Sequence, residues 1–326
     1  MKQRKHIPGV LALWAVFTVA APAAQLFEDF SSDPTARGWK VHGDTNFFVW
    51  NAANQNLEVT WDSSQSNSFF YLPLGTMVSE QDDFQFGFDL KMSDIRIGST
   101  PGKRFTFQIA LGLMNQTNTL ATNLFIGTGN GVRNLVEFDY FPDSGFGATF
   151  ALAVVKTNSA YEYSHNYPLE MTTDDLYHLQ ITYTSSNKTM QMSATCNGVL
   201  FGLGTNSSMN PLVFTNQAGF RVNCFSVTSY NDGKGTGSVL AHGVVDNVSV
   251  TCPDPPVAKI QGGLTNGNWE IGLSSQTNWV YGLQRSADMK TWTNVATVNG
   301  GGPIALRDTN RPTSKPGFYR IMATKP

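Results

Sequence analysis

The sequence predicts an all-β protein built as a large antiparallel sandwich followed by a small one. Hydrophobic and polar residues alternate with a period of two over most of the chain, as expected for strands with one buried face. Only 14% of the residues are charged, against 41% hydrophobic, so amide, hydroxyl and glycine residues must supply much of the surface. No amphipathic helical stripe of useful length is present. The size of the first unit favours a jelly roll.

The N-terminus has the pattern of a secretory signal peptide. An apolar run over residues 10–21 is shorter than the ~20 residues that cross a bilayer, and three cations precede it: Lys2, Arg4 and Lys5. Small residues flank Pro22 at Ala21 and Ala23, as signal peptidase requires. We therefore predict a signal peptide over residues 1–23 and a secreted protein, extracellular, periplasmic or on the cell surface. The alternative, a membrane anchor, is disfavoured because polar sequence follows at once.

Strands can be placed along the large unit, residues 24–252. The alternating runs 84–92 and 105–113 read as two strands joined by a loop, and the simplest interpretation makes them antiparallel neighbours. The runs 177–183 and 190–196 flank the polar stretch 185–188, which predicts a hairpin. Late strands follow near residues 220–225 and 244–250.

A proline-rich connector at residues 253–256 separates a second unit, residues 257–326. Short strand-like segments begin at Trp269, Trp279 and Trp292, with Ser, Asn and Gly turns between them. We predict a small immunoglobulin- or fibronectin-like sandwich. The segments 281–292 and 316–321 resemble small terminal β-sandwich modules of secreted bacterial proteins, a resemblance that implies no chemistry.

Three cysteines remain after export, namely Cys196, Cys224 and Cys252. An oxidising compartment permits one disulfide among them, and the sequence does not choose the pair. The alternative is that they are small buried hydrophobic residues. No CxxC spacing supports zinc binding or thiol redox chemistry.

Acidic residues cluster in one strand-like segment, residues 134–143. Glu137 and Asp139 would point to the same face with their Cα atoms about 6.6 Å apart, so their carboxylates can converge on one cation. Phe141 would add a backbone carbonyl and Asp143 another carboxylate. Such an oxygen-rich set suits calcium or manganese. The alternative is a pair of sheet carboxylates that Lys, Arg or water satisfies.

This segment, Val136-Glu137-Phe138-Asp139 with Phe141 and Asp143, resembles the metal loop of legume-type lectins. The resemblance to the concanavalin A-like lectin and glucanase superfamily extends loosely over residues 25–252. It implies a concanavalin A-like sandwich in which Glu137 ligates a transition metal and Asp139 bridges it to calcium. Phe141 would offer its carbonyl, and Asp143 stands where the family usually has Asn. The further Asp and His of those lectins are absent from residues 144–150.

The same resemblance addresses catalysis. Glucanases of the superfamily carry Glu-x-Asp-x-Glu, with nucleophile and acid/base at its ends, whereas Phe141 occupies the last position here. Phenylalanine can neither donate a proton nor attack a sugar, so the hypothesis of a glucanase-type enzyme is disfavoured. Other catalytic signatures, including HExxH, GxSxG and the Walker A motif, are absent from the sequence.

Aromatic residues beside amide-rich segments suggest a sugar-binding surface. We predict carbohydrate contacts from Trp61, Tyr140 and Asp143, and a second aromatic cluster at Tyr161, Tyr163 and Tyr167 within a loop. Core packing is the competing explanation for each ring.

These observations predict a secreted, non-catalytic, lectin-like protein that binds polysaccharide or glycoprotein glycan with help from calcium. One alternative is a polysaccharide hydrolase or lyase of the same superfamily, and another is an adhesive or structural surface protein without a glycan ligand. A formal charge of −2 gives no electrostatic reason to bind nucleic acid. The sequence indicates no oligomeric state.

Overall fold

The computed structural model describes most of the chain, in eight ranges: residues 23–98, 108–119, 133–204, 211–232, 239–253, 257–277, 279–310 and 317–324. Residues 1–22 of the predicted signal peptide (1–23) and residues 254–256 of the predicted linker (253–256) lie outside them. Within the described residues, no helix is long and apolar enough to span a membrane.

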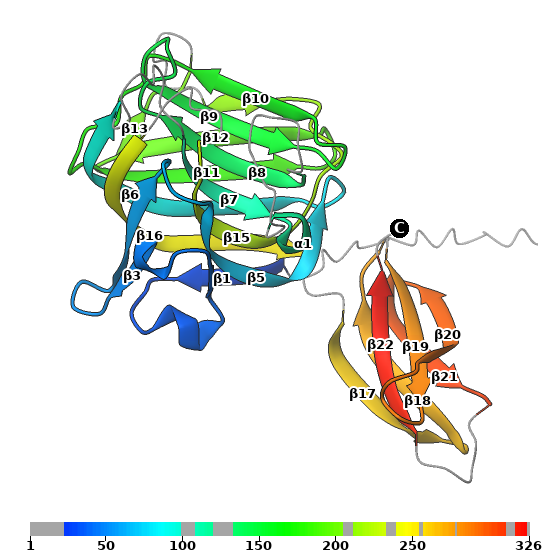
Figure 1. Ribbon diagram of the computed structural model, residues 1–326. Coiled ribbons are helices and arrows are strands. Elements are labelled where there is room, and N and C mark those ends of the chain that lie inside the picture. Colours follow the sequence, from blue (N-terminus) through cyan, green and yellow to red (C-terminus); the bar gives the residue numbers. More distant parts are fainter. Residues whose placement is uncertain are drawn as a thin grey trace, which may run out of the picture.

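Two large antiparallel sheets form the first unit (Figure 1). The nine-stranded sheet has the order β13-β12-β11-β6-β16-β4-β3, with β1 on β16 and β14 on β12. Its strands are β1 (Ala23–Glu28), β3 (Phe48–Asn51), β4 (Asn56–Asp62), β6 (Phe84–Ile97), β11 (Leu176–Thr184), β12 (Thr189–Cys196), β13 (Val199–Phe201), β14 (Leu212–Phe214) and β16 (Val239–Pro253).

The second large sheet has seven strands in the order β10-β9-β8-β7-β15-β5-β2. They are β2 (Lys40–His42), β5 (Ser68–Ser79), β7 (Ile109–Met114), β8 (Leu135–Phe141), β9 (Thr149–Val155), β10 (Tyr161–Asn166) and β15 (Arg221–Ser229). The described residues of this unit also form three short helices: η1 (Pro34–Arg37), η2 (Thr45–Phe47) and α1 (Gln116–Thr119).

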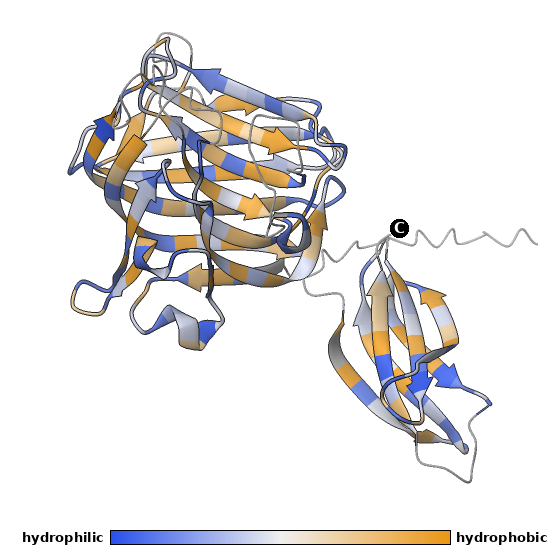
Figure 2. Ribbon diagram, viewed as in Figure 1, coloured by the Kyte–Doolittle hydropathy of each residue, from blue (hydrophilic) through white to orange (hydrophobic). Residues whose placement is uncertain are grey.

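The main core lies between these two sheets. Strands of both contribute every second side chain to it, which gives the alternation of hydrophobic and hydrophilic residues along the arrows in Figure 2. Phe88 of β6, for example, packs against Phe138 of β8 and Phe225 of β15, with ring centroids 5.9 and 6.2 Å away. This confirms the predicted two-sheet, all-β sandwich.

The predicted hairpin is confirmed, because β11 pairs with β12 and Tyr183 lies opposite Met190. The predicted pairing of segments 84–92 and 105–113 is wrong. β6 belongs to the nine-stranded sheet between β11 and β16, whereas β7 belongs to the other sheet. Alternation shows that one face of each strand is buried, but it does not identify the hydrogen-bonded neighbour.

The terminal unit contains two three-stranded sheets, β17-β18-β21 and β20-β19-β22. They pack around a small core that includes Ile271, Tyr281 and Leu306. The strands are β17 (Ala258–Thr265), β18 (Asn268–Ser275), β19 (Val280–Ser286), β20 (Thr293–Asn299), β21 (Gly302–Asp308) and β22 (Phe318–Thr324).

No disulfide joins the three cysteines within the described part of the chain. Cys224 and Cys252 are buried and Cys196 is half-buried. Cys224 faces a small second cluster on the outer side of the seven-stranded sheet. The interpretation as small buried hydrophobic residues therefore fits better than a bridge.

Because the rings of the main core interlock, the stability of the protein should depend strongly on single aromatic side chains. Replacing the fully buried Phe88 with Ala should lower the free energy of unfolding by about 3–5 kcal/mol, because it removes a packed ring and leaves a cavity. Urea denaturation measures this. The control is Val49→Ala, whose side chain is 49% exposed and whose loss should change stability by less than about 0.5 kcal/mol. Equal effects of the two changes would contradict the core described here.

Candidate functional site

β8 places two carboxylates on the outer face of the seven-stranded sheet. Val136, Phe138 and Tyr140 point into the main core, so the period of two sends Glu137 and Asp139 to the opposite face. β8 lies between β7 and β9, well inside the sheet. We call Glu137 and Asp139 the acid pair.

Small residues on the flanking strands make room for the acid pair. Glu137 lies between Gly112 of β7 and Ala153 of β9, and Asp139 lies between two alanines of the same strands. A Cβ atom at Gly112 would come within 2.7 Å of the Glu137 Cβ. Larger side chains at these positions would therefore displace the carboxyl groups.

The acid pair is buried and incompletely hydrogen-bonded. Glu137 is 3% exposed and Asp139 is fully buried. The Tyr230 hydroxyl donates to Glu137 Oε2 at 2.9 Å. Glu137 Oε1 and both Asp139 oxygens have no partner of good hydrogen-bond geometry. The hydroxyl of Tyr161 nevertheless faces Asp139 closely enough to lower the pKa of that carboxyl.

Burial favours the neutral form of both acids. It raises the pKa of Glu137 to about 8, opposed by the hydrogen bond from Tyr230. Burial and the neighbouring Glu137 raise the pKa of Asp139 well above its usual range. Burial, together with the nearby carboxylates, also raises the pKa of Tyr161 and Tyr230. Burial therefore favours the protonated form of both carboxyl groups and of both tyrosine hydroxyls at neutral pH.

Two other buried carboxylates among the described residues are each neutralised by an arginine. Glu28, 2% exposed, pairs with Arg37 and accepts from the Trp39 indole at 2.9 Å. Asp308, 1% exposed, pairs with Arg285 at 2.6 Å. No Lys, Arg or His among the described residues forms such a pair with Glu137 or Asp139. In this respect the acid pair differs from Glu28 and Asp308.

The structure does not assemble the predicted metal ligands. Asp143 lies in the turn after β8, where its Oδ1 accepts from the Gly145 backbone at 2.9 Å, and Phe141 ends the strand. No group of three Asp, Glu, His or Cys side chains in the described ranges is arranged to hold a metal. Two carboxylates fall short of the six to eight oxygens that calcium takes, so these residues do not fit the implied site.

Two of the three predicted carbohydrate contacts are also corrected. Trp61 and Tyr140 are each 1% exposed and lie in the main core. The Tyr140 hydroxyl accepts from the Met171 backbone at 3.1 Å. Both side chains point from their strands into the main core, so neither ring can contact a ligand. Asp143 lies half-buried at the surface and stays a predicted contact.

An exposed row of aromatic rings lies on the edge strand β10, on the same face as the acid pair. Tyr161, Tyr163 and His165 alternate along the strand, with ring centroids 5.4 and 5.2 Å apart. Tyr167 follows at 5.7 Å, parallel to His165 within 9°, and Phe146 at 5.5 Å closes the row. We call these five residues the aromatic row. The expectation of a loop was wrong, since residues 161–166 form a strand.

The other face of β10 is anchored, which leaves the rings outward. Asn166 donates to the backbone oxygens of Leu203 and Gly204 at 2.9 and 2.7 Å, and Ser164 donates to Val213 at 3.1 Å. Tyr163, Tyr167 and Phe146 are 52%, 44% and 73% exposed. The tyrosine alternation was visible in the sequence, but the contribution of Phe146 was not.

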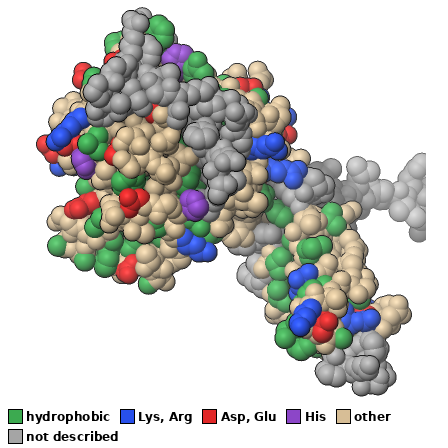
Figure 3. Space-filling model, viewed as in Figure 1, with side chains coloured by type: hydrophobic (Ala, Val, Ile, Leu, Met, Phe, Trp, Pro, Cys, Tyr) green, Lys and Arg blue, Asp and Glu red, His purple; other side chains and the backbone are tan. Residues whose placement is uncertain are grey.

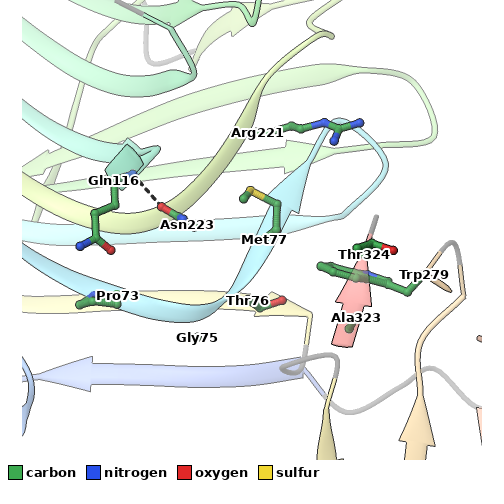
Figure 4. A pocket seen from close by; sticks show the side chains of 10 residues that line it. All are labelled: Pro73, Gly75, Thr76, Met77, Gln116, Arg221, Asn223, Trp279, Ala323 and Thr324. Atoms are coloured by element: carbon green, nitrogen blue, oxygen red, sulfur yellow. Dashed lines mark hydrogen bonds between the residues drawn. The ribbon is translucent and has the colours of Figure 1, made fainter. Parts of the chain in front are cut away.

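A hollow lies between the two units (Figure 4). β5 and β15 line one side, with Met77 and Arg221 among their residues, and Trp279 and β22 line the other, around a cavity of about 470 Å³. Met77 packs against the core of the terminal unit. Trp279 is only 6% exposed, so its ring offers little stacking surface. This hollow supports a ligand less well than the aromatic row.

Comparison with solved structures finds similar chains of low sequence identity, with TM-scores below 0.5. No family model matches the sequence, and no curated protein matches it. Peanut lectin, solved with a nine-residue peptide, is 14% identical, with 71% of this chain and 99% of the lectin covered and a TM-score of 0.44. The seed lectin of Lotus tetragonolobus is 13% identical (70% and 98% covered, TM-score 0.46). A Bacillus subtilis protein of unknown function with a galectin-like fold is 12% identical (71% and 97%, TM-score 0.43).

The raised pKa of Glu137 predicts a pH dependence of stability. The unfolded chain loses this proton near the ordinary value of 4.5, whereas the folded protein keeps it up to about pH 8. The free energy of unfolding should therefore fall as the pH rises from about 4.5 to about 8. Glu137→Gln, which has no proton to lose, should show a smaller fall in urea denaturation across this window.

The control is Glu58→Gln, which changes an exposed carboxyl group on β4. This variant should keep the pH dependence of the wild type. If Glu137→Gln keeps it as well, the carboxyl group of Glu137 is ionised at neutral pH and the description of the acid pair is wrong.

Proposed function

We propose that this protein is a non-catalytic carbohydrate-binding protein, and that the aromatic row is where a polysaccharide or glycan chain lies. The observation that carries the proposal is the succession of five rings, each 5.2–5.7 Å from the next. Aromatic faces pack against the apolar faces of sugar rings, while phenol and imidazole groups donate to sugar hydroxyls. A row of this kind suits an extended chain better than a single sugar.

The charges around the row favour a neutral ligand. The described titratable groups of the row itself are tyrosines and a histidine, and none is a permanent cation. Lys156, the nearest basic residue in sequence, pairs with Glu162 at 2.5 Å. Uncharged side chains and backbone also dominate the view in Figure 3, in which charged groups are scattered. An acidic polysaccharide would find no cluster of cations here.

The predicted signal peptide agrees with a carbohydrate-binding role outside the cytoplasm. The signal peptide predicted over residues 1–23 would place the protein outside the cytoplasm, where such polymers occur. Strand β1, which follows the predicted cleavage position, pairs with β16, and Gln25 lies opposite Thr251. Calcium does not enter the proposed binding mode, since the rings and hydroxyl groups suffice.

The test is affinity electrophoresis of residues 24–326 in gels that contain hydroxyethylcellulose, arabinoxylan or galactomannan, with polygalacturonate as the anionic comparison. We expect retardation by at least one neutral polymer and none by polygalacturonate. Chelator should leave the retardation unchanged. Failure of all three neutral polymers to retard the protein would contradict the proposal and favour an adhesive or structural role.

Removing rings from the middle of the row should weaken this binding. The double change Tyr163→Ala with Tyr167→Ala should raise the dissociation constant about tenfold or more, because a stacked ring at a binding centre contributes roughly 1–2 kcal/mol. Phe27→Ala is the matched control: this ring on β1 of the other sheet is 62% exposed. The control should bind as the wild type does, and equal losses in both variants would contradict the location of the site.

A further inference from the structure

The hollow of about 470 Å³ between the two units, which we call the inter-unit hollow, is lined on one side by a bulge of β5. The register of β5 against β15 shifts after Pro73, so residues 74–77 lie opposite Asn223 alone. Gly75 has a φ of +70°, a conformation that glycine adopts without steric cost. Bulges of this kind re-aim side chains and are common beside functional sites. Here the bulge turns toward the terminal unit (Figure 4).

Arg221, at the start of β15, is the one charged residue among the described residues that line the inter-unit hollow. Two buried asparagines hold its backbone. The Asn134 side chain accepts from the Arg221 N–H at 2.9 Å, and the Asn115 side chain donates to the Arg221 carbonyl at 3.1 Å. The Arg221 side chain itself is exposed. An arginine anchored in this way, beside a hollow whose described lining has no acid, favours a negatively charged ligand.

Neutral donors accompany this cation. Thr76 lines the hollow and is 6% exposed, and its hydroxyl group has no hydrogen-bond partner among the described residues. Asn223 uses its amide oxygen to accept from the Gln116 backbone at 2.8 Å, which leaves its NH₂ group as a donor. A buried hydroxyl group without a partner costs free energy that a ligand with acceptor oxygens recovers.

The remaining wall of the hollow is apolar and comes from both units. Met77 of β5 packs against the core of the terminal unit, and Trp279 belongs to that core. Pro73 and Ala323 lie beside them in the lining. The Trp279 ring is too buried to stack on a sugar, but its edge and Met77 can contact a compact apolar group. The volume lies within the roughly 300–1,000 Å³ of small-molecule sites.

We propose that the inter-unit hollow binds a small organic carboxylate, with the anion on Arg221 and an apolar body against Met77 and Trp279. One cation balances the single negative charge of a carboxylate, whereas a phosphate group carries about −1.5 to −2 at neutral pH. The guanidinium fork also matches a carboxylate in shape. Because both units line the hollow, the bound molecule holds them together. This site is separate from the aromatic row, which lies on β10 at the far edge of the sheet.

Binding is measured by NMR of residues 24–326 labelled with ¹³C in the methionine methyl groups, with 4-hydroxybenzoate and hexanoate as probes. We expect the Met77 methyl signal, identified with Met77→Leu, to shift when either acid is added at millimolar concentration. The matched amides, 4-hydroxybenzamide and hexanamide, have the same bodies without the charge and should bind about tenfold more weakly. Equal binding of acid and amide, or no shift at Met77 with either acid, would overturn the proposal.

Two substitutions test the polar contacts. Arg221→Gln should raise the dissociation constant of both acids about tenfold or more, because it removes a charge-assisted pair of hydrogen bonds. Arg96→Gln is the matched control, since this arginine on β6 of the other sheet has a side chain that is 68% exposed, and it should leave binding unchanged. Equal losses in the two arginine variants, or unchanged binding in Arg221→Gln, would contradict the site.

Thr76→Val removes a hydroxyl group and keeps the shape of the side chain. It should weaken binding of the acids about threefold. The free energy of unfolding in urea should not fall, because the hydroxyl group loses no described partner. A clear loss of stability with unchanged binding would show that this hydroxyl group serves the fold, and would overturn its role as a ligand donor.

Sulfate and galacturonate test the class of ligand. Sulfate supplies negative charge without an apolar body, and galacturonate supplies a carboxylate on a hydroxylated sugar. At equal concentration neither should displace 4-hydroxybenzoate from the hollow. Displacement by sulfate would reveal a general anion site, and displacement by galacturonate would reveal a site for acidic sugars, so either result would overturn the proposal. None of these measurements depends on the neutral polymers that test the aromatic row.

Discussion

The pairing of β8 with β7 and β9 is the constraint on which both the core and the candidate site depend. Its fixed register sends Phe138 into the main core and, in the same few residues, sends Glu137 and Asp139 to the outer face. A slip of one residue would bury the two acids among aromatic rings. The many aromatic contacts of the core therefore hold the carboxyl groups where solvation alone would not.

The outer face combines an open part and a closed part. At the sheet edge, β10 carries rings that are up to half exposed, because its opposite side chains hydrogen-bond to the backbone of β14 and of the segment after β13. Toward the sheet centre, small residues admit the carboxyl groups of the acid pair. Tyr161 belongs to both parts. Its ring contacts Tyr163 and its hydroxyl faces Asp139, so the aromatic row and the acid pair are continuous through this one side chain.

Sequence reasoning recovered the architecture because a period of two depends only on local composition. It recovered the shared face of Glu137 and Asp139 for the same reason. It failed where the answer depends on distant segments: the sheet to which β7 belongs, the turn that occupies Asp143, and the burial of Trp61 and Tyr140. The alternation of hydrophobic and polar residues could not show whether the buried face of a strand packs in the main core or in the second cluster on the outer side of the sheet.

The resemblance to legume-type lectins drew attention to the strand that carries Glu137 and Asp139, but the metal site that it implies is not assembled by the described residues. The motif places two acids correctly, but the remaining ligands do not gather around them. Among the described residues no third carboxylate and no cation joins Glu137 and Asp139, so their burial favours the protonated form over metal binding. The tyrosines of β10, which belong to no motif, became informative only when the strand and its exposed face were known.

The most direct test of the account is a crystal structure of residues 24–326 with a neutral oligosaccharide cut from whichever polymer retards the protein. The account predicts sugar rings stacked on Tyr163 and Tyr167 along β10, with no metal ion at Glu137 and Asp139. A sugar seated in the hollow around Trp279 instead, or a calcium ion between the two acids, would contradict it.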